Sequence, residues 1–173
     1  MRAFPLKTQL FILTTISLGV CLLAWNLSQL ESGNTWMLLA LTAGASISLI
    51  LKVEGSTNRS HYNISFLIYA FSFALLGLER TVLIILVSNL IDWAWHKYAW
   101  YIQLFNISTY IIAINAAGLV LALINPGQHL YSLEAVLGTL AAISAFTLIN
   151  HFLVGLVIWL ARGEPFSKSG VFD

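Results

Sequence analysis

Long apolar stretches constrain this sequence more than any other feature. Six of them follow one another along the chain, separated by short polar segments. Only 9% of the residues are charged, whereas a soluble globular domain carries about 25%. A chain of 173 residues also has too much surface to bury all of its apolar side chains away from water. Lipid is the solvent that fits, and we expect the lipid bilayer to be the main partner of the chain.

Transmembrane helices explain these stretches, because one crossing needs about 20 mostly apolar residues. β-Barrel strands do not explain them, since such strands are about 10 residues long and alternate in polarity. The predicted fold class is therefore all-α, a polytopic transmembrane bundle of six helices. Its spans are expected at residues 9–27, 36–51, 63–78, 81–95, 102–124 and within 133–160.

The segment 63–95 requires a break. As one helix it would be about 50 Å long, which is too long for a single straight crossing. Residues 77–80 combine a glycine with a glutamate and an arginine, and these two charges should not remain in hydrocarbon. We therefore predict a hairpin at 77–80 between the third and fourth spans.

The last apolar stretch is longer than one crossing requires. A helix over residues 133–160 would be about 42 Å long, whereas the hydrocarbon core is about 30 Å thick. The helix either tilts, extends beyond the core or breaks near Asn150 and His151. Residues 1–163 are predicted to form one six-helix transmembrane domain, and residues 164–173 a cytoplasmic polar tail or the start of a linker.

The first span has an alternative interpretation as a cleaved signal peptide, because Arg2 and Lys7 precede its apolar segment 10–25. That segment is longer than the roughly 7–15 apolar residues of a signal peptide, and no small-residue cleavage site follows it. We interpret it as a retained helix.

The basic residues indicate the orientation of the bundle. With the N-terminus inside, seven of the eight Lys and Arg residues fall on the inner side, and only Arg80 falls on the outer side. The inner segments are 1–8, 52–62, 96–101 and 161–173. Because basic residues accumulate in cytoplasmic segments, both termini are predicted to be cytoplasmic. The expected location is the plasma membrane, as a multi-pass protein.

Polar side chains within the spans are candidates for a functional site. The residues proposed to contact a small-molecule ligand are Asn106, Asn115, Asn150 and His151. Their alternative role is structural, because amide and hydroxyl groups in lipid bond across helices at about 0.6–2 kcal/mol each. Several small residues, including Ala113, Ala117 and Gly118, allow close helix packing but do not indicate a function.

Asp92 is the most informative charge within the spans. His96 lies four residues later, so that the two side chains share one helix face. We predict an ion pair between them at the cytoplasmic interface. A metal site is the alternative, but no further ligands lie nearby in the sequence. No metal and no cofactor is therefore predicted.

Other function classes lack their sequence signals. The chain has 8 basic and 7 acidic residues, so nothing suggests nucleic-acid binding. It contains no P-loop, no His-Glu-x-x-His, no Gly-x-Ser-x-Gly and no cysteine pair. The sequence therefore predicts that the protein is not an enzyme.

Several short motifs carry a family resemblance. They are Leu76-Gly77 before Glu79-Arg80, Leu104-Phe105-Asn106, Ala116-Ala117-Gly118, Leu148-Ile149-Asn150-His151-Phe152 and Leu160-Ala161-Arg162-Gly163. With them, the stretch from about residue 61 to 163 resembles the N-terminal membrane region of bacterial signalling proteins. In those proteins a multi-helix membrane domain precedes a cytoplasmic HD-GYP phosphodiesterase or GGDEF cyclase module.

This resemblance implies a sensory or anchoring domain of the bacterial inner membrane, which passes a membrane or ligand signal to a fused or separate cytoplasmic module. The sequence departs from the family pattern because it reaches Asp173 before any output module, and its last residues look like the start of a further segment. The six-helix arrangement is also similar to the substrate-binding S components of energy-coupling-factor vitamin transporters. That likeness implies a small-molecule-binding transport subunit as the alternative function.

Overall fold

Six α-helices make up most of the computed structural model, which describes residues 4–31, 33, 35–51, 53–54, 61–62, 64–125 and 132–163. The helices are α1 (Leu6–Ser28), α2 (Thr35–Ile50), α3 (Ser65–Leu76), α4 (Leu78–His96), α5 (Trp100–Ile124) and α6 (Leu133–Arg162). Two short strands, β1 (Val53–Glu54) and β2 (His61–Tyr62), pair in antiparallel orientation within the predicted polar loop 52–62. The helical fold class is thus confirmed, with this small strand pair as an addition.

Three of the helices, α1, α5 and α6, are long and apolar enough to cross a membrane. Helices α2 and α3 are apolar but shorter, and α4 carries three charged residues that lower its hydropathy. Many large apolar side chains point outward, such as Trp36, which is 82% exposed, and Leu123, which is 81% exposed. Apolar surface of this extent is unfavourable in water and indicates contact with lipid.

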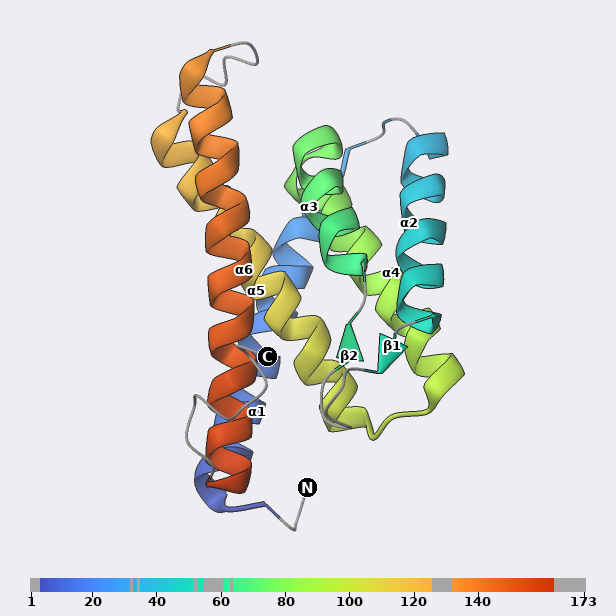
Figure 1. The fold of residues 1–173 in the computed structure, drawn as a ribbon, viewed down its shortest axis with the longest axis vertical. Coiled ribbons are helices and arrows are strands. Elements are labelled where there is room, and N and C mark those ends of the chain that lie inside the picture. Colours follow the sequence, from blue (N-terminus) through green and yellow to red (C-terminus); the bar gives the residue numbers. More distant parts are fainter. Residues whose placement is uncertain are drawn as a thin grey trace.

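The helices run alternately in opposite directions along the bundle (Figure 1). α5 packs most extensively against α6 and α1, and α4 packs against α5 on one side and α2 on the other. The start of α1 and the end of α6 lie at the same end of the molecule, where the Thr8 hydroxyl donates a hydrogen bond of 2.8 Å to the Leu160 carbonyl oxygen. We call this end the terminal end and the opposite one the far end.

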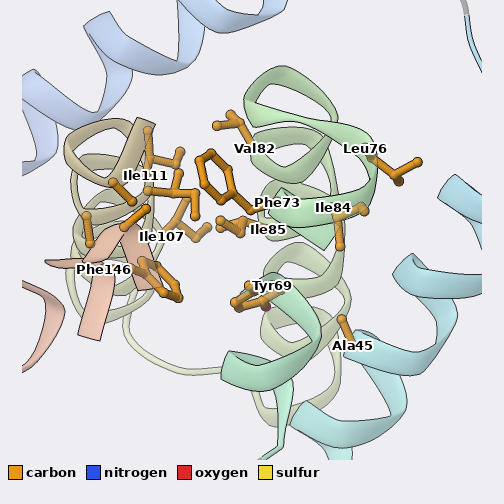
Figure 2. Packing of buried hydrophobic residues seen from close by; sticks show 14 residues of the cluster. Ala45, Tyr69, Phe73, Leu76, Val82, Ile84, Ile85, Ile107, Ile111 and Phe146 are labelled. Carbon is orange, nitrogen blue, oxygen red and sulfur yellow. The ribbon is translucent and has the colours of Figure 1, made fainter. Parts of the chain in front are cut away.

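The apolar core lies where α3, α4, α5 and α6 meet (Figure 2). Tyr69 of α3 and Phe146 of α6 are its largest fully buried side chains. Phe146 stacks on Phe66 with ring centroids 4.9 Å apart, and Ile107 and Ile111 of α5 belong to the same cluster. These contacts join helices that are far apart in sequence, so the bundle has one continuous interior.

The break between the third and fourth helices is tighter than the predicted hairpin at 77–80. α3 ends at Leu76 and α4 begins at Leu78, so that Gly77 alone separates them. Gly77 has a φ of 82° and a ψ of −178°, a conformation that is essentially restricted to glycine. The Thr81 hydroxyl donates to the Gly77 carbonyl oxygen at 2.7 Å and stabilises this start of α4. The predicted turn residues 78–80 therefore form the first turn of a helix.

The last helix is continuous. α6 spans 30 residues without a break at Asn150 and His151, which corresponds to about 45 Å. The Ser132 side chain accepts a hydrogen bond from the Ala135 amide at 3.1 Å and caps its first turn, and Gly163 ends it with a φ of 67°. The predicted tail, residues 164–173, lies outside the described residues.

Candidate functional site: an interhelical cavity

An open cavity of about 1200 Å³ lies in the far half of the bundle. Residues of α1, of the α3–α4 junction, of the second half of α5 and of the start of α6 form its walls. Small-molecule sites in proteins usually occupy about 300–1,000 Å³, so this cavity is large enough for one such ligand. We call it the far-end cavity.

The walls of the far-end cavity are mainly apolar, with a few polar groups. Leu22, Phe73 and Leu121 are among the apolar lining residues. The polar lining residues are Glu79, Asn115, Asn125 and Thr139. An apolar pocket with a small number of polar groups is typical of a binding site for a small organic molecule.

Asn115 is the predicted ligand residue that lines the cavity. Its side-chain oxygen accepts a hydrogen bond of 2.9 Å from the Asn26 amide of α1, and its own amide donates to the Ile111 carbonyl oxygen at 2.8 Å. Asn26 is only 1% exposed and also donates to the Leu22 carbonyl oxygen. The Asn26–Asn115 pair therefore fixes α1 against α5 at the cavity wall and leaves the second lone pair of the Asn115 oxygen as an acceptor.

The structure does not bring the other three predicted ligand residues to this cavity. Asn106 lies nine residues before Asn115 on α5, which is about 13.5 Å along the helix axis. Asn150 is half-buried on α6, and its side-chain oxygen has no hydrogen-bond partner among the described residues. His151 is exposed, with its Nδ1 atom 2.8 Å from the Thr147 carbonyl oxygen. The four residues do not form one cluster.

The predicted pair Asp92 and His96 does meet. Asp92 Oδ1 lies 2.8 Å from His96 Nδ1, and the Asp92 side chain is only 6% exposed. The pair is placed near the end of α4, and His96 also stacks on Tyr98. Within the described residues no group of three His, Cys, Asp or Glu side chains is arranged to hold a metal ion.

A buried polar network precedes this pair along α4. The Tyr69 hydroxyl lies 2.8 Å from the Ser88 hydroxyl and accepts a hydrogen bond from the Asn89 amide at 2.9 Å. The Gln103 amide donates to the Asn89 carbonyl oxygen at 2.8 Å and so ties α5 to α4. Such bonds between helices stabilise a membrane bundle, which gives this network a structural role.

The roles of several residues in the far-end cavity and in the buried polar network are not predicted by the sequence. The sequence predicts Glu79 in a turn, yet it lies on α4 and lines the cavity. The sequence does not indicate the contacts of Tyr69 and Gln103, because an isolated polar residue in an apolar stretch does not reveal its partner. One available signal was the spacing of Ser88, Asp92 and His96, which places three polar side chains on one face of a helix.

Comparison of the chain with protein-family models, with curated proteins and with solved structures finds no match. The candidate function therefore depends on the geometry of the site.

Proposed function

We propose that all six helices cross the bilayer, with the terminal end of the bundle in the cytoplasm of a bacterial cell. Alternation of the helix directions supports this arrangement. Lys7 and Arg162 lie at the terminal end, as expected from the excess of basic residues in cytoplasmic segments, whereas Arg80 lies at the far end. The far-end cavity then faces the outer half of the membrane.

An alkaline phosphatase reporter tests this topology, because the enzyme is active only outside the cytoplasm. Fused after Asp173 it is expected to be inactive, and fused after Asn125 at the far end it is expected to be active. The amounts of the two fusion proteins are compared by immunoblotting. Phosphatase activity of the Asp173 fusion would contradict the proposed orientation.

The proposed function is that of a membrane sensory domain, which binds a small amphipathic molecule and passes the signal to a cytoplasmic module. The far-end cavity carries this proposal, because its size and its mixed lining suit one such molecule. In this proposal, α6 transmits the signal from the far-end cavity to the terminal end of the bundle. It lines the cavity with Ala135 and Thr139 and continues without a break to Arg162, and its last turn is bonded to Thr8 of α1.

A binding subunit of a vitamin-type transporter is the second candidate, because the same cavity would hold a vitamin-sized molecule. Such a subunit needs an energising ATPase and a membrane coupling protein. Neighbouring genes for these two components would favour transport over sensing.

Filling the cavity tests the binding function common to both candidates. Thr139 is a half-buried wall residue of α6, and Thr139→Trp places a large ring in the cavity. Ser144→Trp is the matched control, since Ser144 lies on the same helix, is exposed and does not line the cavity. We expect wild type and Ser144→Trp to co-purify with the same small molecule, and Thr139→Trp to retain at least tenfold less of it by mass spectrometry of organic extracts. Equal recovery from all three proteins, or none from any, would disprove binding in this cavity.

A further inference from the structure

The lining of the far-end cavity includes a charged residue, Glu79. Among the lining residues that the structure describes, Glu79 alone is ionisable as an acid or a base, and the other polar ones are two asparagines and a threonine. A carboxylate in a mainly apolar wall favours a cationic over an anionic ligand, because opposite charges attract and like charges repel.

The Glu79 carboxylate is not neutralised by its neighbours. It is half-buried, and it forms no hydrogen bond or ion pair with any other residue in the described part of the chain. The adjacent Arg80 is directed elsewhere, because its guanidinium group lies against Gly33 and donates to the Leu76 carbonyl oxygen at 3.4 Å. Glu79 lies in the first turn of α4, where the helix dipole stabilises a negative charge.

The surroundings of the cavity have the same sign. Glu31 follows the end of α1, and Glu134 lies in the first turn of α6 beside the lining residue Ala135. Among the described residues of the far end, they and Glu79 contribute three carboxylates, compared with the one guanidinium group of Arg80. A surface of predominantly negative charge attracts cations to it and raises their rate of association.

We propose that the ligand of the far-end cavity is an organic cation, an apolar molecule that carries one protonated amine. This inference depends on the proposed function and specifies the class of ligand. The ammonium group pairs with the Glu79 carboxylate, the apolar body packs against Leu22, Phe73 and Leu121, and Asn115 accepts a further hydrogen bond. A carboxylate or phosphate ligand would meet a like charge in the same place.

Two probes that differ mainly in charge test the inference. Phenethylamine is a cation at neutral pH, and phenethyl alcohol is its neutral counterpart of similar size. Their binding to the full chain in lipid nanodiscs is measured by titration calorimetry, with empty nanodiscs as the blank. We expect the wild-type chain to bind the amine at least tenfold more tightly than the alcohol.

Three variants assign that preference to its residue. Glu79→Gln is expected to remove the tenfold preference and to leave the affinity for the alcohol unchanged, which shows that the cavity itself is intact. Glu31→Gln is the matched control, because it removes an exposed carboxylate at the same end and should retain the preference. Thr139→Trp should weaken the binding of both probes.

Each alternative outcome has a separate meaning. Equal affinities for the two probes in the wild-type chain, both lost in Thr139→Trp, would overturn the cation inference and leave the binding function standing. A preference for the amine that survives in Glu79→Gln would overturn the role of this carboxylate. Failure of both probes to bind would also overturn the inference, while the co-purification experiment decides the binding function independently.

Discussion

Replacement of Gly19 by alanine is expected to destabilise the bundle strongly. Gly19 of α1 is buried against Ser108 of α5, and a β-carbon at this position would overlap the Cβ and Oγ atoms of Ser108. Because both groups belong to helices, relief requires the two helices to separate. Overpacking of this kind costs roughly 1–3 kcal/mol, and we expect the free energy of unfolding to fall by that amount.

The control for this experiment is Gly44→Ala. A β-carbon at Gly44 of α2 would lie 3.7 Å from Ile68 Cδ1, which is an ordinary contact. Alanine is also favoured over glycine inside a helix by about 1 kcal/mol, so this variant should be neutral or stabilised. Equilibrium unfolding of both variants in mixed detergent micelles provides the comparison. Equal stability of the two variants would mean that α1 and α5 are not in contact at Gly19.

Replacement of Phe146 by alanine is expected to cost about 3–5 kcal/mol, the typical loss for a buried phenylalanine. Phe146 is fully buried in the cluster that Figure 2 shows. Its ring stacks on Phe66 and lies near Tyr110, with the latter ring centroids 6.2 Å apart. Truncation therefore leaves a cavity where α3, α5 and α6 meet. Phe146→Leu should recover part of the loss, because it refills some of the volume.

Phe152→Ala is the matched control for Phe146. Phe152 lies on the same helix but is 57% exposed, in the region assigned to lipid. Its truncation should change the free energy of unfolding by less than about 1 kcal/mol. The same unfolding titration measures all three variants, and a larger loss for Phe152→Ala than for Phe146→Ala would show that the assignment of core and lipid face is inverted.

The helical class and the approximate positions of the six helices could be predicted from the sequence, because apolar stretches and charged interruptions are local features. The contact of Asp92 with His96 was predictable for the same reason, since a spacing of four residues places two side chains next to each other on any helix. The single-residue break at Gly77 was not, because a glycine followed by charged residues is compatible with turns of several lengths.

The candidate site was harder to predict, because its residues come from four separate parts of the chain. The sequence predicts Asn115 as a ligand residue, but its partner Asn26 is 89 residues away, and no spacing rule connects them. Glu79 is not predictable as a helical residue, because the pattern of charges predicts the start of the fourth span at residue 81, whereas α4 begins at Leu78. Asn106, Asn150 and His151 carry amide and imidazole groups of the kind that bind ligands, yet none of them lines the cavity.

The bond between Thr8 and Leu160 has a consequence for the order in which the chain assembles. Helices α2, α3 and α4 contact one another as sequence neighbours, so they can pack as soon as they have been synthesised. α1 packs mainly against α5, and its Thr8 side chain bonds to the end of α6, 152 residues further along the chain. Because the N-terminal part is synthesised first, α1 is the first helix to enter the membrane but among the last to complete its contacts with other helices. Until then Thr8 lacks the Leu160 carbonyl oxygen and Asn26 lacks Asn115, so these two bonds between helices form late in assembly.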